Sequence, residues 1–409
     1  MKVALITYAL NLGGMETFLF RLARQFVPPK HSVDIILIED RGSWVDHFMA
    51  HGISVKPLFG SALRSRTHHA RQIARSLQEY DVVFLNDAPF AQSVLGLLRP
   101  DTVAISIIHA DMHSMYRNAI GSAGEWERVV CVGPRLASRL QAEYGITADK
   151  VRMIPYGVQV NEQWPRTEAD FDSDHPLRVV YAGRLEDRQK GVLRLPDILS
   201  GARKLVPSIE LQIIGDGPDS ARLRQAMAEA GLNGCVRFSG RLTPEQTREA
   251  LLEQNVLLLP SNFEGLPVIV LEALASGVVP VASLMPGITD FQIESGRTGF
   301  LVNPEDIEGY AQALTSLAMD RGLLRQMSEA GWREARLRFS VETMCQAYVE
   351  LIEECRARIR QRAQPVRSGR MDYSLLGDLP GCPTCMVRPL RKVLRSFGLW
   401  SQFSTASEM

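Results

Sequence analysis

Short apolar segments alternate with amphipathic helical segments twice along this chain, and an acidic, proline-containing stretch separates the two series. The first series ends at 151–158, and the second begins with an apolar segment at 177–185. Strands that alternate with helices form parallel sheets covered by helices on both faces. The sequence therefore predicts an α/β protein of two similar units, which face a central cleft and bind ligands at the carboxyl ends of their strands.

A chain of 409 residues exceeds the size at which one hydrophobic core keeps growing, so two domains are expected. Residues 161–176 lack apolar periodicity and are acidic, which is typical of a linker. Between 81 and 158 the apolar runs indicate further strands. The expected parts are a domain at 1–160, the linker at 161–176, a domain at 177–340, a long helix at 341–363 and a basic tail at 364–409.

Two glutamates, Glu264 and Glu272, lie in the run PSNFEGLPVIVLEALASGVVP at 260–280. The run follows a short apolar strand, and Pro267 marks the start of a helix. Glu264 is expected at the mouth of this helix and Glu272 about two turns inside it, roughly 12 Å away along the axis. That span fits a sugar, a diphosphate and a ribose, with N–H groups of the helix N-terminus facing the diphosphate. A solvated helix face is the alternative, but the neighbours of Glu272 are apolar.

Two cations and a glycine turn follow strands expected in the second series. Arg184 and Lys190 come at and after the end of the strand at 177–185, where their charges could stabilise a leaving diphosphate. An exposed basic loop is the alternative. Gly215 follows the next strand and could let the backbone approach a nucleotide base.

The first series contains two further candidates. Gly13 and Gly14 lie between the first strand and the first helix, where the backbone could approach a phosphate or a sugar, although such a turn alone is a weak signal. His109 ends a strand and is followed by Asp111. This histidine could bond a sugar hydroxyl or the reaction centre, or it could be structural.

In their combined order and spacing, these motifs make residues 1–360 resemble a retaining glycosyltransferase of family 4, with the GT-B architecture of two Rossmann-like domains. The motifs that carry the resemblance are GGMET at 13–17, VRMIPYGV at 151–158, AGRLEDRQKG at 182–191, IIGDGP at 213–218, the run at 260–283 and GRTGFLV at 296–302. Asp290 and Tyr156 depart from it, because the family often has Glu and Asn at these positions.

The resemblance implies a nucleotide-diphosphate sugar donor and a glycan or lipid-linked acceptor. It makes the domain at 1–160 the acceptor side and the domain at 177–340 the donor side, with the C-terminal helix crossing back. Retention would follow front-face attack, with the leaving phosphate taking the acceptor proton and with neither a metal nor a cofactor. The implied catalytic residues are Glu264, His109, Arg184 and Lys190. The implied donor-binding residues are Gly13, Gly14, Arg184, Lys190, Gly215, Gly265, Leu266 and Glu272, of which Glu264 contacts the sugar hydroxyls and Glu272 the ribose.

The expected function is therefore a retaining hexosyl- or related glycosyltransferase of lipopolysaccharide, exopolysaccharide or glycolipid synthesis. A non-catalytic GT-B paralogue that acts as a partner subunit and a GT-B nucleotide-sugar epimerase are the alternatives. A dinucleotide enzyme would carry GxGxxG after its first strand, and LGGMET lacks that spacing. Nothing in the sequence favours a nucleic-acid partner.

Charge and cysteine usage bear on location. Six scattered cysteines indicate a reducing compartment, so a cytoplasmic protein is expected, and the isolated CxxC at Cys382 and Cys385 has no second ligand pair. No apolar run is long enough to span a bilayer. The first 160 and the last 54 residues are net basic, which suits an anionic membrane surface at the inner face of the plasma membrane or ordinary solubilising charge.

Overall fold

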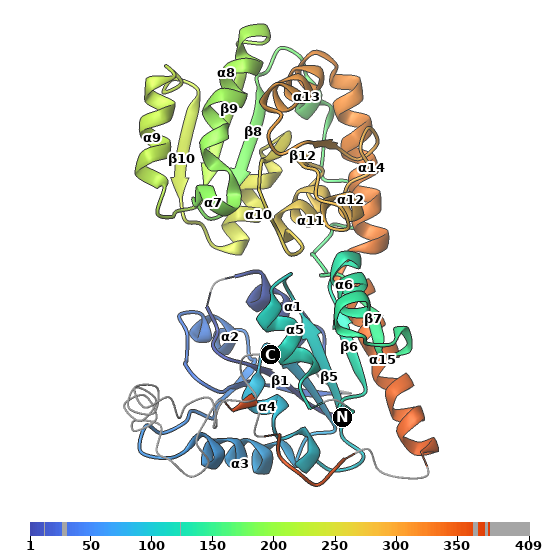
Figure 1. Cartoon of the computed structure of the whole chain (residues 1–409). Coiled ribbons are helices and arrows are strands. Elements are labelled where there is room, and N and C mark those ends of the chain that lie inside the picture. Colours follow the sequence, from blue (N-terminus) through green and yellow to red (C-terminus); the bar gives the residue numbers. More distant parts are fainter. Residues whose placement is uncertain (12, 27–30, 123, 363–366, 373–374, 377–409) are drawn as a thin grey trace. The chain divides into compact units, whose positions relative to one another are not determined.

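The structure is a computed structural model that describes residues 1–11, 13–26, 31–122, 124–362, 367–372 and 375–376. The chain forms two compact units (Figure 1). Unit 1 comprises Met1–Val132, Leu136–Pro155 and the chain from Cys345 on, and unit 2 comprises Gly133–Arg135 and Tyr156–Met344. Most of the basic tail expected at 364–409, including Cys382 and Cys385, lies outside the described residues.

Unit 1 is built on a seven-stranded parallel sheet of order β3-β2-β1-β4-β5-β6-β7. Its strands are β1 (Lys2–Thr7), β2 (Ser32–Leu37), β3 (Ser54–Pro57), β4 (Val82–Asn86), β5 (Val103–Ile108), β6 (Arg128–Cys131) and β7 (Val151–Met153). The strand order reverses between β1 and β4, and such a switch point is where open α/β sheets bind ligands.

The helices of unit 1 were only partly expected from the sequence. They are α1 (Gly14–Gln25), α2 (Val45–Ala50), α3 (Arg66–Leu77), α4 (Pro89–Gln92), α5 (His113–Ile120), most of α6 (Pro134–Tyr144) and most of α15 (Val341–Gln361). The Ser65 hydroxyl caps α3 by accepting a bond from the His68 N–H at 3.1 Å. α4, α5 and α6 fall in the region where the sequence indicated only strands, because the strong apolar runs of β4 to β6 dominate the pattern there.

Unit 2 is built on a six-stranded parallel sheet of order β10-β9-β8-β11-β12-β13, with its switch point between β8 and β11. The strands are β8 (Leu177–Ala182), β9 (Ile209–Ile214), β10 (Val236–Gly240), β11 (Val256–Leu259), β12 (Val279–Ser283) and β13 (Phe300–Val302). The helices are α7 (Asp187–Lys190), α8 (Leu195–Leu205), α9 (Ser220–Glu229), α10 (Pro244–Leu252), α11 (Val268–Ala275), α12 (Thr289–Gln292), α13 (Ile307–Met319) and α14 (Arg321–Arg338). The prediction of two parallel-sheet α/β units is confirmed.

The segment expected as a linker is attached to unit 2. The Arg166 side chain is only 1% exposed. Its guanidinium donates to the carbonyl oxygens of Ser276 at 2.9 Å, Leu252 at 2.8 Å and Leu251 at 3.2 Å. Burial lowers the pKa of Arg166 to about 10, so the guanidinium stays charged at neutral pH. Because the backbone carbonyls satisfy this buried charge, residues around 166 behave as part of unit 2.

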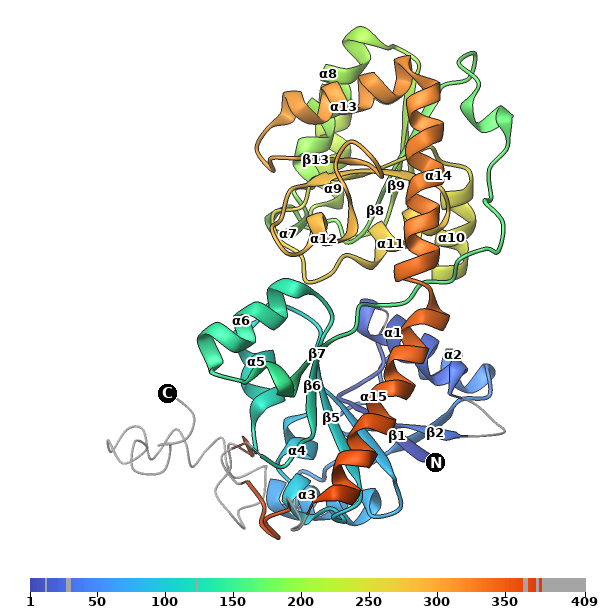
Figure 2. The ribbon, with the colours of Figure 1, turned by 90° about the vertical axis from the view of Figure 1, so that its right-hand side faces the viewer.

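The last helix returns the chain to unit 1, as Figure 2 shows for α15. The Tyr348 ring lies 5.9 Å from the Phe18 ring and 5.5 Å from the Phe84 ring. Further along α15, the Glu354 carboxylate accepts a bond from the Arg128 guanidinium at 2.7 Å. None of the described helices is long and apolar enough to cross a membrane.

Candidate functional site

The candidate donor residues of unit 2 gather at one edge of its sheet. Arg184 follows β8, Lys190 ends α7 in the same connection, Gly215 follows β9, and Glu264 follows β11. Since β8, β9 and β11 run parallel and neighbour one another, their carboxyl ends lie at the same edge. The structure therefore brings together groups that are up to 80 residues apart in the sequence.

Lys190 and Glu264 form an ion pair at this edge. The Lys190 ammonium lies 2.7 Å from Oε1 and 2.8 Å from Oε2 of Glu264. The side chains are only 17% and 6% exposed, so water weakens their attraction little. The Ser261 hydroxyl, itself fully buried, donates to Oε1 at 2.7 Å. The sequence assigned these two residues to different parts of a donor and gave no sign that they pair with each other.

Arg184 is placed differently from Lys190. Its side chain is 65% exposed, and its Nε lies 3.3 Å from the Glu186 carboxylate. Exposed ion pairs of this kind contribute little to stability, so the guanidinium can exchange this partner for an incoming anion at small cost. The Arg184 backbone is fixed, because its carbonyl oxygen accepts a bond from the Tyr181 hydroxyl at 2.9 Å.

Gly215 allows the loops after β8 and β9 to pack closely, which the sequence did not indicate. Its φ of +136° is a conformation that L side chains rarely adopt. A Cβ at this position would lie 1.8 Å from the Gly183 carbonyl oxygen. The loops that follow β8 and β9 can therefore touch only because residue 215 has no side chain. They are joined further by the Leu185 N–H, which donates to the Asp216 carbonyl at 3.0 Å.

The geometry predicted for the two glutamates was wrong in one respect. α11 begins at Val268, so Glu264 lies in the preceding loop and Glu272 is the fifth helical residue. At 1.5 Å per residue, Glu272 lies about 6 Å along the axis from Val268, which is about one turn inside the helix and not two. The helix starts directly after Pro267, as predicted, and Ser261 and Lys190 hold Glu264 in the loop before it. Glu272 is half-buried on a helix whose other residues are largely apolar.

Two further residues of this run, Gly265 and Leu266, lie in the loop between β11 and α11. Leu266 is buried and Gly265 is half-buried. Asp290, where the resemblance favours Glu, is exposed, and its carboxylate accepts a bond from the Ile288 N–H at 3.1 Å. Tyr156, the second departure, is buried. Asp290 thus stabilises its own loop through a backbone bond.

The glycine turn of unit 1 is covered by a carboxylate. α1 begins at Gly14, and the Thr17 hydroxyl donates to the Gly13 carbonyl at 2.8 Å. A Cβ on Gly13 would lie 2.7 Å from Oε2 of Glu16, so the carboxylate occupies the space above the turn. Burial raises the pKa of Glu16 above its ordinary value. A negative group at this helix N-terminus favours a hydroxyl over a phosphate as the neighbour of Gly13 and Gly14.

His109 follows β5 at the carboxyl edge of the unit 1 sheet and is only 5% exposed. Its Nε2 lies 2.9 Å from Oδ1 of Asn86, and the Asn86 Nδ2 donates to the Ile6 carbonyl at 3.1 Å. The bond to Ile6 fixes the amide orientation, so Oδ1 is the acceptor and the histidine proton is on Nε2. Burial lowers the pKa of His109 to about 3, so the ring is neutral at physiological pH.

Asn86 is the residue of this group that the sequence analysis missed. It is the fully buried last residue of β4, beside the switch point of the sheet. The next residue, Asp87, has a φ of +48°, which is strained for a side chain other than glycine. The sequence signal for Asn86 was a polar residue at the end of a buried strand. Asp111, in contrast, accepts bonds from Tyr116 at 2.9 Å and Arg139 at 2.7 Å.

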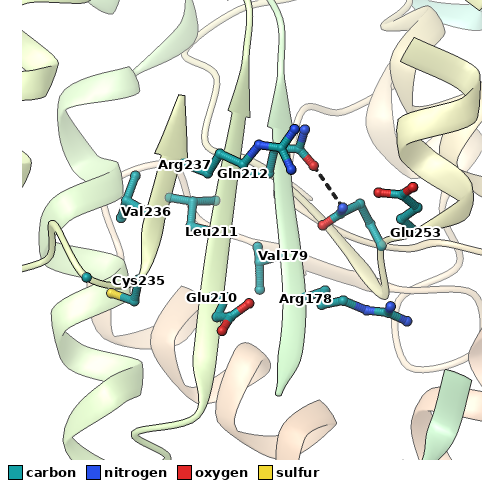
Figure 3. Close-up of a pocket in the computed structure, with 11 residues that line it drawn as sticks. Arg178, Val179, Glu210, Leu211, Gln212, Cys235, Val236, Arg237 and Glu253 are labelled. Carbon is teal, nitrogen blue, oxygen red and sulfur yellow. Dashed lines mark hydrogen bonds between the residues drawn. The ribbon is translucent and has the colours of Figure 1, made fainter. Parts of the chain in front are cut away.

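A separate cavity of ≈ 530 Å³ lies on unit 2 (Figure 3). It opens near the amino ends of β8, β9 and β10, and its lining includes Arg178, Glu210 and Arg237. None of the candidate donor residues lines it. Across the described residues, no three His, Cys, Asp or Glu side chains come together as metal ligands.

Comparison with known families matches both halves of the chain. The model "Glycosyltransferase Family 4" matches residues 12–162, and the model "Glycosyl transferases group 1" matches residues 166–333. Together the two models cover both units.

Curated relatives are similar at lower identity. The GDP-mannose:cellobiosyl-diphosphopolyprenol alpha-mannosyltransferase of Xanthomonas oryzae pv. oryzae (strain PXO99A) is 26% identical over 331 residues, which are 76% of this chain and 84% of the relative. The lipopolysaccharide core biosynthesis glycosyltransferase LpsE of Rhizobium meliloti (strain 1021) is 29% identical over 187 residues, or 46% of this chain. The chain spans 52% of the length of LpsE.

Solved structures share the fold. Anabaena HepE in complex with UDP superimposes with a TM-score of 0.74 at 18% identity, over 87% of this chain and 100% of that one. The apo form of the lipopolysaccharide outer core galactosyltransferase WaaB gives 0.65 at 21% identity, over 87% and 99% of the two chains.

Proposed function

The chain belongs to the glycosyltransferases, as a GT-B enzyme with a family 4 domain followed by a group 1 domain, and we propose that it transfers its sugar with retention of anomeric configuration. The acceptor in this proposal is a hydroxyl of a glycan or lipid-linked glycan. The observation that carries the proposal is the Lys190–Glu264 pair at the carboxyl edge of the unit 2 sheet. In this proposal the cation of the pair binds the diphosphate, and the carboxylate beside it binds the sugar hydroxyls.

Lys190 and Arg184 bind the donor diphosphate in this proposal. Negative charge grows on the diphosphate as the glycosidic bond breaks, so cations beside it lower the barrier of the chemical step. Lys190 is already positioned by Glu264 and Ser261. Arg184 is exposed and can close on the diphosphate after it binds. Glu264 then accepts bonds from sugar hydroxyls, and Glu272 accepts bonds from the ribose.

Retention is proposed to follow attack from the face of the leaving group, with the leaving phosphate oxygen taking the acceptor proton. The environment of Glu264 supports this route over a covalent intermediate. Both of its oxygens contact the Lys190 ammonium, and one also accepts the Ser261 hydroxyl. A carboxylate stabilised in this way is a weak nucleophile, because attack would require it to give up these bonds.

The acceptor is proposed to be membrane-borne, with the protein working in the cytoplasm at the inner face of the plasma membrane. The names of the relatives support this choice, since one acts on a diphosphopolyprenol-linked sugar and another in lipopolysaccharide core synthesis. The basic charge of residues 1–160 also supports an anionic surface as partner.

The direct test is to incubate the purified protein with a panel of nucleotide sugars and to measure the release of free nucleoside diphosphate. One donor should be consumed in preference to the others, and NMR of the transferred sugar should show the anomeric configuration of the donor. Glu264→Gln is the matched control, since it keeps the shape of the site. An inverted product would refute retention, and conversion of a donor into its epimer without transfer would favour the epimerase alternative.

A further inference from the structure

Asp87 directly follows β4 at the switch point of the unit 1 sheet, and its backbone is strained. Its φ of +48° lies in the left-handed region, which residues other than glycine rarely adopt. Such a conformation persists only where the surrounding structure enforces it, and it is most common at functional sites. Asp87 is therefore a candidate for a role in the acceptor half of the reaction.

One oxygen of the Asp87 carboxylate is fixed and the other is available. Oδ1 accepts a bond from Nδ2 of Asn118, on α5, at 2.6 Å. Oδ2 has no hydrogen-bond partner among the described residues, and Asp87 is only half-buried. An asparagine would suit this φ at least as well and would keep the bond to Asn118, so neither the turn nor that bond requires a charge. The charge of Asp87 is left for a ligand.

Tyr8, which follows β1, supplies a hydroxyl near this carboxylate. Burial raises the pKa of Tyr8 above its ordinary value, the carboxylates of Glu39 and Asp87 raise it further, and Arg66 opposes them. The hydroxyl is therefore protonated at neutral pH, and in the part of the chain that the structure describes it bonds to no other side chain. A hydroxyl beside a carboxylate matches a sugar hydroxyl, which both accepts and donates a hydrogen bond.

The place of these two residues in the sheet suits a ligand. Tyr8 and Asp87 follow β1 and β4, the paired strands on either side of the switch point, where open α/β sheets bind ligands. Asn86, the residue before Asp87, holds the neutral His109 ring at 2.9 Å. A sugar bound here would meet hydrogen-bonding groups without a positive charge, so a neutral hydroxyl is favoured over a phosphate.

A later part of the chain holds the segment that begins at Asp87. We call the described residues 367–372 and 375–376 the strap. The Asp372 N–H donates to the Ser93 carbonyl at 2.8 Å. Ser93 is fully buried just after α4, the short helix that follows Asp87. The strap thus fastens the end of this segment from outside.

A recess in unit 1 receives the strap. The Gly369 N–H donates to the Gly96 carbonyl at 3.0 Å. A Cβ on Gly96 would lie 2.3 Å from the Arg370 carbonyl oxygen, so the strap passes through space that a side chain would fill. The Arg367 guanidinium, 4% exposed, lies 3.4 Å from the carboxylate of Glu127, which is 2% exposed. Because removing either buried charge would leave the other unpaired, the strap is firmly anchored.

The strap also connects the two elements that fix Asp87. The Ser122 N–H donates to Oδ2 of Asp372 at 3.0 Å, and the Ser122 hydroxyl donates to the Gln92 carbonyl at 2.8 Å. Gln92 ends α4, and Ser122 follows α5, the helix that carries Asn118. The strap therefore fixes the segment after Asp87 relative to the helix that binds its side chain.

We propose that Asp87 binds the acceptor by accepting a hydrogen bond from a sugar hydroxyl, and that the strap holds the Asp87 backbone in the strained conformation that this contact requires. The assignment rests on the proposed transfer to a glycan hydroxyl and narrows the group bound here to a neutral hydroxyl. Asp87 takes no proton in this step, because the leaving phosphate oxygen is the proposed base. Asn118 and the strap act through Asp87 as positioning elements.

The first test is transfer from the preferred nucleotide sugar to octyl glycosides of glucose, galactose, mannose and N-acetylglucosamine. Asp87→Asn keeps the turn, so its Tm should stay within about 1 °C of wild type. A neutral acceptor bonds a hydroxyl more weakly than a carboxylate does, so KM for the best glycoside should rise about fivefold, and the ratio of transfer to hydrolysis should fall. Asp101→Asn, at a carboxylate with 72% of its side chain exposed, is the matched control and should transfer like wild type.

The second test displaces the strap without changing any charge. Gly96→Ala puts a methyl group against the Arg370 carbonyl, whereas Gly234→Ala, with open space around residue 234, is its control. Faster tryptic cleavage after Arg367 should show that the strap has moved. Gly96→Ala should lower the ratio of transfer to hydrolysis at least about twofold more in wild type than in Asp87→Asn, because the strap acts through that residue. Equal losses in both backgrounds would refute the role of the strap.

A binding measurement separates this proposal from the proposed function. Saturation-transfer NMR should show the best octyl glycoside bound to wild type and more weakly bound to Asp87→Asn. A wild type that neither hydrolyses nor transfers would refute the proposed function, while this difference in binding would still support Asp87 as the hydroxyl-binding residue. The assignment is overturned if no octyl glycoside binds wild type, or if Asp87→Asn binds and glycosylates the glycoside as wild type does.

Discussion

Replacing Glu264 with Gln should strengthen the binding of a free nucleoside diphosphate while it weakens sugar transfer. In the structure, the Glu264 carboxylate holds the Lys190 ammonium through contacts of 2.7 and 2.8 Å. A diphosphate that binds Lys190 must compete with this carboxylate. The amide of Gln keeps the size of the side chain and an acceptor for the Ser261 hydroxyl, but it removes the competing charge.

The magnitude follows from the contacts that are exchanged. A hydrogen bond to a charged group contributes about 1.5–3 kcal/mol, and in this exchange the Lys190 ammonium gives up one such partner to gain another. Removing the first partner should therefore make the free energy of diphosphate binding more favourable by about 1 kcal/mol, which is about a fivefold gain in affinity. The sugar hydroxyls lose a charged acceptor, so kcat/KM should fall by about 1.5–3 kcal/mol, or roughly 10- to 150-fold.

Isothermal titration of UDP, GDP and ADP identifies the preferred diphosphate, and the same titration is then repeated with Glu264→Gln and Lys190→Met. Lys190→Met is the matched variant, because it removes the cation at the same place and should weaken diphosphate binding. The two partners of one ion pair should thus shift the same affinity in opposite directions. If Glu264→Gln weakens diphosphate binding as Lys190→Met does, the carboxylate does not compete for Lys190 and this reasoning is refuted.

Five further outcomes are expected. In ¹⁵N NMR spectra His109 should stay neutral, with its proton on Nε2, between pH 5 and 8, because burial lowers its pKa to about 3. Below about pH 6.5 the unfolded state binds a proton at this residue and the native state does not. His109 should therefore lower the free energy of unfolding as the pH falls from 7 toward 3. Asn86→Asp should raise the pKa of His109 into the range between pH 5 and 8 that these spectra cover. An unchanged titration of His109 would show that the two side chains are not in contact. Glu272→Ala should weaken nucleoside diphosphate binding by about 1.5–3 kcal/mol in the folded protein, and unchanged affinity would remove the ribose assignment. Arg184→Ala should lower kcat more than it raises KM, whereas Arg188→Ala, at an exposed position of α7 in the same connection, should not. Transfer should also survive EDTA, and an absolute need for a divalent ion would contradict the role given to the cations.

The sequence predicted the architecture well because each strand carries its own signal. β1, β4, β5 and β11 are largely buried on both faces and therefore read as nearly continuous apolar runs. The start of α11 directly after Pro267 was also predicted, but the depth of Glu272 inside the helix was overestimated by about one turn. The bonds that hold Glu264 outside the helix come from Lys190, 74 residues earlier in the chain.

The missed contacts share one physical cause. Asn86 meets His109 because the neighbouring strands β4 and β5 pair along their length, and Arg367 meets Glu127 because the chain returns to unit 1 after α15. Short polar residues at strand ends carry no periodic signal, so composition and spacing cannot tell a solvated asparagine from one that fixes a histidine tautomer. Contacts of this kind become visible only in three dimensions.

In the proposed function, the charges at the carboxyl edge of unit 2 let one site be stable when empty and still bind an anion. A buried lysine alone would be costly, and the Glu264 carboxylate offsets that cost while no donor is bound. A nucleotide sugar supplies both replacements at once, because its diphosphate can take the ammonium while its hydroxyls donate to the carboxylate. A free diphosphate replaces only the partner of Lys190. Glu264 would then lose its cation and receive no hydrogen bond from a sugar hydroxyl. If the proposed roles of Lys190 and Glu264 hold, the pair favours the intact donor over the product diphosphate, which is the preference that a transferase needs in order to release its product.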